Sequence, residues 1–431
     1  MQLTYNQLLD QCRELAVSGE FAEIEPLADA MLATDPAVET GWILKAVAMI
    51  GTGRIDAGLA LVDNASDESL TDTLIAVMAG RFLLDAGAFQ HLSAISKIES
   101  ADCANRAIWL YFAGCGLMMT GAETLAFECF DSFNDAVRPL VARHGVALFI
   151  ENQSLNLVLR QGRLVAGPDE VEARIRRFAQ KPVRPDLDII HSPIGEGLLF
   201  VSCCNGEYFD AFGDLFTHRL MAWREDVQLH LQVSQPGTTS EARLLALADT
   251  YPGRLGYGVT RNPPHATAAY FTCERFFVAE HLLRTLGRAV MTLDLDVTPR
   301  AAAPDFHTFA DSADFACFET GRNEPASVLQ ASAMIWNPGA ASLSHLSAVQ
   351  AYCLGGDDIE NPSFVSWMID QAALFSVRHF FNVRRPGQVR FADLRDAGVT
   401  LEQAFETIGE EEQKQALKNR VYAGEKTEIR L

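Results

Sequence analysis

Glycine recurs every 34 residues through the first third of this 431-residue chain. The glycines of this repeat are Gly19, Gly53, Gly87 and Gly121. Apolar residues around the first glycine follow helical spacing, with Leu15 before it and Ile24 and Leu27 after it. Glycine between two helices allows the backbone conformation that reverses the direction of the chain. The repeat therefore predicts antiparallel helix pairs over residues 1–135 that turn near each glycine.

A residue with a small side chain lies seven positions before each of these glycines. These small residues are Cys12, Ala46, Gly80 and Gly114. Small side chains at these positions would let the paired helices approach each other closely.

The repeat resembles the tetratricopeptide repeat, whose unit is a helix–turn–helix of 34 residues. Trp42 falls at the aromatic position that opens the first helix of a unit, and Pro36 falls at the proline that closes the unit before it. The resemblance implies roughly three to four degenerate repeats, and such repeats usually present a concave surface to a protein or peptide. We therefore expect a protein partner for this region. A plain helical bundle is the alternative.

Acidic residues outnumber basic ones, and the formal net charge is −21. Such a surface repels a phosphate backbone, which excludes a general nucleic-acid binder. No apolar run reaches about 18 residues, the usual length of a membrane span. Residues 1–15 lack the basic and apolar regions of a signal peptide. Nine cysteines without a CxxC pair are typical of reduced thiols, and we expect a cytoplasmic protein without a membrane span.

A connecting segment is predicted over residues 136–185. It contains a short hairpin around Gly162 and a helix over 168–179 with acidic residues in its first turn. The basic side chains at 174–184 are expected to face solvent rather than to bind phosphate. Prolines at the end of the segment mark a domain boundary. Residues 401–431 have mixed charges and are expected to form an exposed helical tail without a function.

The region 186–400 alternates strands with helices. Its alternating or apolar runs predict strands at Leu198–Ser202, Val227–Val233, Arg254–Tyr257 and Ala289–Leu293. The runs between them predict helices at Glu207–Trp223, Ser240–Leu247, with Ser240 as the N-cap, and Phe276–Leu286. This order predicts an α/β fold with a mostly parallel sheet. Ligands of such sheets bind beyond the carboxyl ends of the strands.

The last of these strands ends in Asp294-Leu295-Asp296. Neighbouring carboxylates repel each other and any phosphate, so a divalent cation is the simplest explanation for the pair. Mg²⁺ or Mn²⁺ takes oxygen ligands and is commonly held by one or two carboxylates together with substrate phosphates. A strand-end turn with solvated acids is the alternative.

The segments around this strand resemble the donor half of GT-A type nucleotide-diphospho-sugar glycosyltransferases. Those enzymes often carry an Arg-Phe pair, here at Arg275, before the strand that delivers the D-x-D, and several carry an Asp-Gln helix, here at Asp370. The resemblance covers about residues 188–385 and implies a Rossmann-like GT-A domain. The matching segments, in the order found in the family, are residues 270–277, 333–337 and 367–374.

The resemblance also implies a role for each matching residue. Asp294 and Asp296 would hold Mn²⁺ or Mg²⁺ on the donor diphosphate, Asp294 partly through the ribose. Arg275 would contact the nucleotide or its phosphates, because a guanidinium suits phosphate oxygens. Asp370 would approach the sugar or the acceptor hydroxyl and would be the base of an inverting enzyme. The other expected site residues are Ser202, Cys203 and Asn205 beside the nucleotide and His379, the last histidine, on the metal.

Three hypotheses about function stay open at this point. The first is a metal-dependent glycosyltransferase whose repeats recruit a protein acceptor or partner. The second is a transferase acting on a lipid-linked or polysaccharide acceptor, with repeats that serve only assembly. The third is a repeat scaffold with an inactive α/β domain.

Overall fold

The computed structural model describes residues 5–64, 72–97, 105–144, 165–265, 268–309, 313–321, 323–355, 369–410 and 414. The chain divides into two compact units. The helical unit comprises residues 1–167 with 323–325, and the α/β unit comprises residues 168–322 and 326–431. The hairpin expected around Gly162 lies outside the described residues. No helix among the described residues is long and apolar enough to cross a bilayer.

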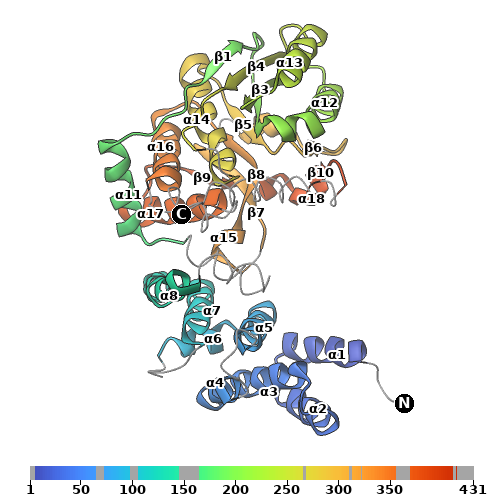
Figure 1. The fold of residues 1–431 in the computed structure, drawn as a ribbon, viewed down its shortest axis with the longest axis vertical. Helices are drawn as coiled ribbons and strands as arrows, with labels where there is room; N and C mark the ends of the chain where they lie inside the picture. Colours follow the sequence, from blue (N-terminus) through green and yellow to red (C-terminus); the bar gives the residue numbers. More distant parts are fainter. Residues whose placement is uncertain are drawn as a thin grey trace. The chain divides into compact units, whose positions relative to one another are not determined.

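The described part of the helical unit is built from consecutive helices that pack in chain order (Figure 1). They are α1 Tyr5–Val17, α2 Phe21–Thr34, α3 Glu39–Gly51, α4 Ile55–Asn64, α5 Asp72–Asp85, α6 Phe89–Ile95, α7 Arg106–Met119 and α8 Glu123–His144.

The same turn closes a helix at all four repeat glycines. Each glycine has a φ between 72° and 82°. This left-handed conformation is strained for residues with a Cβ atom, and glycine adopts it freely. At the second turn, Gly53 N donates to Ile50 O at 2.9 Å and Arg54 N donates to Met49 O at 2.8 Å. This pair of bonds is the Schellman motif, which satisfies the last carbonyls of a helix, and it recurs at the other three glycines. The predicted helix pairs and their turning points are therefore confirmed.

The small residues before the glycines are packed against the neighbouring helix. A Cβ on Gly80 of α5 would lie 2.2 Å from Cδ2 of Phe112 on α7, and one on Gly114 would lie 2.7 Å from Cε1 of Phe130 on α8. Helix α7 is buried along most of its length, as expected for a helix enclosed by its neighbours. Close helix approach, predicted from the seven-residue spacing, is thus found in the helical unit.

Replacing Gly80 with valine should destabilise the helical unit. The added side chain meets the ring of Phe112, and such overpacking costs about 1–3 kcal/mol. Urea denaturation measures the loss, and Met78→Val, at a half-exposed position of the same helix, is the matched control. Adding Phe112→Ala to Gly80→Val should recover part of the loss. A double variant whose loss is the plain sum of the two single losses would contradict the contact.

The α/β unit is centred on a mixed sheet of eight described strands, of which four neighbouring pairs are parallel and three antiparallel. In spatial order these are β1 Asp188–His191, β4 Leu255–Thr260, β3 Gln228–Ser234, β2 Leu199–Asn205, β5 Val290–Leu293, β8 Leu329–Trp336, β7 Phe315–Glu319 and β9 Phe391–Asp393. A second, two-stranded sheet pairs β6 Val297–Pro299 with β10 Phe405–Thr407.

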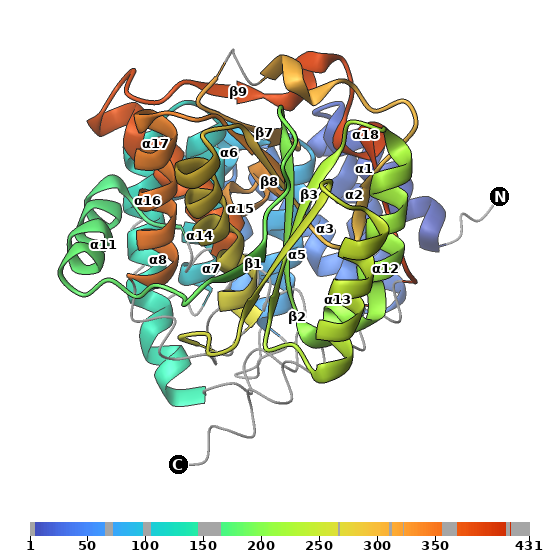
Figure 2. The same cartoon turned by 90° about the horizontal axis from the view of Figure 1, so that it is seen from above.

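Helices cover both faces of the large sheet (Figure 2). One face carries α12 Gly206–Trp223 and α13 Thr238–Thr250, and the other carries α14 Ala268–Leu286, α16 Ala340–Leu354 and α17 Ile369–Arg384. The remaining elements are α11 Pro168–Gln180, α15 Pro325–Val328, α18 Leu401–Ala404 and the 3₁₀ helices η1 Phe306–Phe309 and η2 Leu394–Ala397.

The two faces of the central strands differ in chemistry. Alternate residues such as Leu229, Leu231 and Val233 of β3 belong to the apolar core. The residues that alternate with them, including Gln232 and Ser234, are polar and buried. Hydrogen bonds satisfy several of these groups, for example from Gln232 Nε2 to Thr260 Oγ1 at 2.9 Å. A buried polar layer therefore lies between the sheet and α14.

Four local expectations were wrong. Residues 401–410 are not an exposed helical tail, because they contain strand β10, in which Phe405 is buried. Helix α13 begins after Gly237, so Ser240 is not its N-cap but lies inside the helix, where its hydroxyl donates to Asp210. The helix expected at Phe276–Leu286 begins earlier, at Ala268, so residues 270–277 form part of α14. Arg174 does not face solvent, because its guanidinium is buried and donates to Tyr352 O and Glu170. For Ser240 and Arg174, the difference arises from a contact with a residue distant in sequence, which local spacing does not report.

Candidate active site

The carboxyl ends of four neighbouring strands meet at one edge of the sheet. Strands β4, β3, β2 and β5 are mutually parallel, so their last residues lie at the same edge, where α/β sheets bind ligands. These end positions are Thr260, Ser234, Asn205 and Asp294, the last directly after β5. The sheet order therefore brings polar residues from distant parts of the chain to a common edge.

The Asp294-Leu295-Asp296 segment forms a turn that separates its two carboxylates. Val297 N donates to Asp294 O at 3.0 Å, and Asp294 N donates to Ser332 O at 3.0 Å. Leu295 is buried in the apolar core. Burial of this leucine fixes the turn, and the two aspartates reach different partners.

Arg275 of α14 joins Asp294 to Asp370. Its Nη1 lies 2.5 Å from Asp294 Oδ1 and also donates to Ala331 O at 2.9 Å. Its Nη2 lies 3.8 Å from Asp370 Oδ2. Burial alone would lower the pKa of the Arg275 guanidinium, but Asp294 and Asp370 outweigh burial and raise that pKa. Arg275 is therefore a permanent positive charge between two carboxylates.

Asp370 lies in the first turn of α17 and is almost completely buried. Its Oδ1 accepts a hydrogen bond from Gln371 N at 2.7 Å. Burial raises the pKa of Asp370 to about 7, against the opposing effect of Arg275, and the charge on Asp294 adds to the rise. A carboxyl group that titrates near neutral pH is suited to accept and release a proton.

Asp296 has its own set of partners. Its Oδ2 accepts a hydrogen bond from Tyr208 Oη at 3.1 Å and lies 3.0 Å from Lys414 Nζ. Burial, followed by the charge of Asp296, raises the pKa of Tyr208, so its hydroxyl stays a donor. Neither Tyr208 nor Lys414 was expected from the sequence, because no motif marks a tyrosine in a helix or a lysine in a charged tail.

The residues expected beside the nucleotide are placed differently from one another. Asn205 caps α12, and its Oδ1 accepts from Tyr208 N at 3.0 Å. Cys203 lies two residues before the end of β2 and is partly exposed. Ser202 is buried inside the sheet, and its hydroxyl finds no hydrogen-bond partner among the described residues. The structure therefore brings Asn205 to the carboxyl edge and leaves Ser202 within the core.

The expected metal ligands do not form a ready cation site. Among the described residues, no group of three or more His, Cys, Asp and Glu side chains could hold a metal ion. His379 lies nine residues beyond Asp370 on α17, about 13 Å along the helix axis and half a turn around it. Asp294 and Asp296 are each already paired with a basic side chain. The residues as they stand do not fit a divalent cation, and Mn²⁺ or Mg²⁺ stays a prediction from the sequence.

Glu274, next to Arg275 on α14, is a buried carboxyl group that sequence reasoning missed. Ser234 Oγ donates to its Oε2 at 2.6 Å, whereas its Oε1 finds no partner among the described residues. Burial raises the pKa of Glu274 to about 7, although hydrogen bonds from Ser234 and Thr260 oppose the rise. Glu274 therefore ionises near neutral pH at the carboxyl ends of β3 and β4.

Replacing Glu274 with glutamine should increase the stability of the variant relative to wild type by more at pH 8 than at pH 4.5. The pKa of Glu274 is raised from 4.5 to about 7 on folding. Its favourable contribution is therefore complete below pH 4.5 and is lost as pH rises through 7, by roughly 3 kcal/mol. Glutamine does not titrate, so its advantage over glutamate should grow across this range. Urea denaturation at several pH values checks this, with Glu207→Gln, at an exposed position of α12, as control. A difference between variant and wild type that does not change with pH would contradict the raised pKa.

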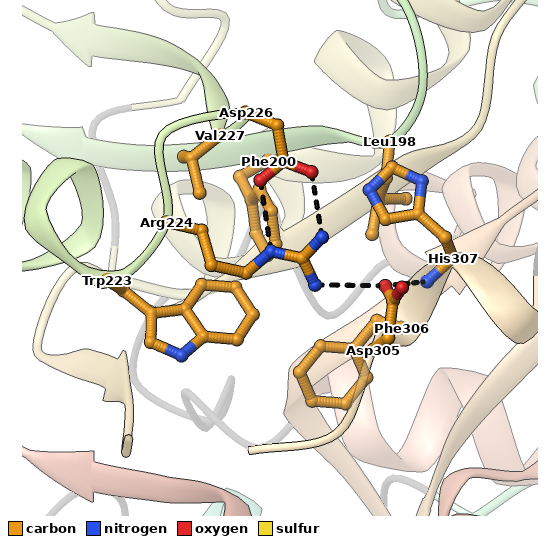
Figure 3. A pocket seen from close by; sticks show the side chains of 9 residues that line it. All are labelled: Leu198, Phe200, Trp223, Arg224, Asp226, Val227, Asp305, Phe306 and His307. Carbon is orange, nitrogen blue, oxygen red and sulfur yellow. Dashed lines mark hydrogen bonds and ion pairs between the residues drawn. The ribbon is translucent and has the colours of Figure 1, made fainter. Parts of the chain in front are cut away.

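A small pocket lies at the opposite edge of the sheet (Figure 3). It is lined at the amino ends of β2 and β3 by Leu198 and Val227, and Arg224 extends across it. The Arg224 guanidinium pairs with Asp226 at 2.7 Å and Asp305 at 3.2 Å. These pairs satisfy the charges within the pocket, so we assign it a structural role.

Comparison with known proteins gives partial likenesses. No family model and no curated protein matches the chain. Among solved structures, a galactosyltransferase, LgtC, in complex with donor and acceptor sugar analogs is 12% identical, over 41% of this chain and 70% of that chain, with a TM-score of 0.31. The apo structure of WbbM, a bifunctional glycosyltransferase, is 14% identical, over 40% of this chain and 38% of that chain, with a TM-score of 0.28. The function of this chain therefore has to rest on its own residues.

Proposed function

We propose that the α/β unit is a glycosyltransferase that takes a sugar from a nucleotide-diphospho-sugar. The observation that carries the proposal is the cluster of Arg275, Asp294 and Asp370 at the carboxyl edge of the sheet. It combines a permanent positive charge, a partly exposed carboxylate and a buried acid with a pKa of about 7. Phosphate binding, hydroxyl binding and proton transfer are the three tasks of a sugar transfer from a diphosphate.

Each residue has a distinct role in this proposal. The Arg275 guanidinium would offset the negative charge of the diphosphate, because its planar donors suit phosphate oxygens. The Asp294 carboxylate, which is 33% exposed, would accept hydrogen bonds from ribose or sugar hydroxyls. In an inverting transfer, Asp370 would accept the proton of the acceptor hydroxyl. The oxygen of that acceptor hydroxyl would attack the anomeric carbon as the bond from the sugar to the diphosphate breaks.

The acceptor is proposed to be a protein recruited by the helical unit. Tandem helix pairs that stack in chain order are common protein-binding surfaces, and the positive-φ glycines at a period of 34 residues support the repeat interpretation. A polysaccharide or lipid-linked acceptor is the alternative for the same chemistry. The Mn²⁺ or Mg²⁺ site predicted from the sequence at Asp294 and Asp296 is tested separately, by adding the donor with and without the ion.

A thermal-shift screen with nucleotide-diphospho-sugars tests the proposal. UDP-, GDP-, ADP- and dTDP-linked sugars are each added with and without Mn²⁺, and one nucleotide class should raise the melting temperature. A donor at 100 times its Kd adds about 2.7 kcal/mol of apparent stability. Arg275→Lys should reduce the shift, whereas Arg176→Lys, at an exposed position on α11, should not. No shift with any donor, with or without Mn²⁺, would favour a scaffold with an inactive α/β domain.

A further inference from the structure

Lys414 is a buried lysine held against Asp296. Its side chain is only 2% exposed, and its Nζ lies 3.0 Å from Asp296 Oδ2. Moving an ammonium group out of water is costly unless a partner compensates it. The buried ammonium group of Lys414 therefore needs its ion pair with Asp296, which is not an incidental surface contact.

The C-terminal segment, defined here as residues 405–410 and 414, is attached to the Asp294–Asp296 turn by backbone bonds. Strand β10 pairs with β6, which directly follows the turn, and Ile408 N donates to Asp296 O at 2.8 Å. Lys414 N then donates to Glu410 O at 3.1 Å. These backbone bonds are part of the fold of the α/β unit, and they hold Lys414 beside Asp296.

The charges around the two aspartates are already balanced. Arg275 pairs with Asp294, and Lys414 pairs with Asp296. These two cations supply the charge that a divalent ion would bring to two carboxylates. An added divalent ion would have to displace them or lie close to them, and repulsion between like charges in a buried site opposes this.

We propose that Lys414 is a built-in counter-ion of Asp296 that takes the place of a divalent metal ion at the donor site. The inference rests on the proposed function, because the charge of Lys414 would assist the binding of a donor diphosphate. Lys414 acts through Asp296: it neutralises a carboxylate that would otherwise repel the diphosphate. It is a positioning residue, and donor binding should not require Mn²⁺ or Mg²⁺.

Titration of Mn²⁺ alone into the full-length chain tests this inference without a donor. Wild type should bind Mn²⁺ no better than Asp296→Asn does. Lys414→Met removes the charge and retains an unbranched apolar side chain, so Asp296 becomes available and Mn²⁺ should bind roughly tenfold more tightly than to wild type. Lys414→Arg keeps the charge and should behave as wild type. Adding Asp296→Asn to Lys414→Met should remove the gain.

The outcomes separate this inference from the proposed function. Tight Mn²⁺ binding by wild type that is lost in Asp296→Asn would overturn the role of Lys414, even if Lys414→Met failed to fold. Equal Mn²⁺ affinity in wild type and folded Lys414→Met would overturn it as well. If a nucleotide-sugar binds only with Mn²⁺, the inference fails and the proposed function stands. If no nucleotide-sugar binds but Lys414→Met gains Mn²⁺, the proposed function fails and the counter-ion role stands.

Discussion

Replacing Arg275 with methionine should destabilise the α/β unit by about 3–5 kcal/mol at pH 8, because the change leaves buried charge without its partner. Arg275 is the cation between Asp294 and Asp370, and its side chain is 9% exposed. Without it, the pKa of Asp370 should rise above its present value of about 7. The loss should therefore be smaller at pH 5, where Asp370 is protonated in the folded variant.

Urea denaturation at pH 5 and pH 8 measures this effect. Arg176→Met, at a 69% exposed position on α11, is the control and should change stability by less than about 0.5 kcal/mol. Arg275→Lys keeps the charge but loses the fork of donors, so it should have an intermediate effect. A loss for Arg275→Met that matches the control would mean that the cluster does not need its cation.

Replacing Asp370 with asparagine should slow donor turnover by about 10²–10⁴-fold, the usual contribution of a general base. The base has to be ionised to accept a proton, and burial sets the pKa of Asp370 to about 7. Wild-type turnover should therefore rise with pH through 7 and level off above it. The residual turnover of Asp370→Asn should lack this step.

Release of nucleoside diphosphate from the stabilising donor reports turnover, with water or the natural acceptor receiving the sugar. Asp169→Asn, which removes an 87% exposed carboxylate on α11, should retain the wild-type rate and pH profile. A variant at position 370 with full turnover and an unchanged pH step would exclude Asp370 as the base. A fall in turnover with an unchanged pH profile would mean that Asp370 supports turnover without being the group that titrates.

Local sequence signals were sufficient for the helical unit. The glycines at a period of 34 residues mark the left-handed turns because few other residues accept a φ near 80°. The small residues before them, such as Gly80, mark close helix contacts because a larger side chain would overlap a phenylalanine. Both signals are local in sequence, so both can be recognised without knowledge of the tertiary structure.

The carboxyl edge was predictable in part. Asp294 directly follows a buried strand, so alternating strands and helices place it at the ligand-binding edge. Arg275 and Asp370 were expected only from a resemblance to a family, and the structure brings both to Asp294. Lys414 could not be expected, because the pairing of β6 with β10 joins segments about a hundred residues apart through strands of three residues each.

Calorimetric titration of the stabilising nucleotide-sugar tests most directly whether the carboxyl edge is the donor site. The proteins compared are wild type, Asp294→Asn at the carboxyl edge and Asp226→Asn in the pocket at the opposite edge. We expect one site in wild type, roughly tenfold weaker binding or more in Asp294→Asn, and unchanged binding in Asp226→Asn. Weaker binding in Asp226→Asn with unchanged binding in Asp294→Asn would contradict the carboxyl-edge site.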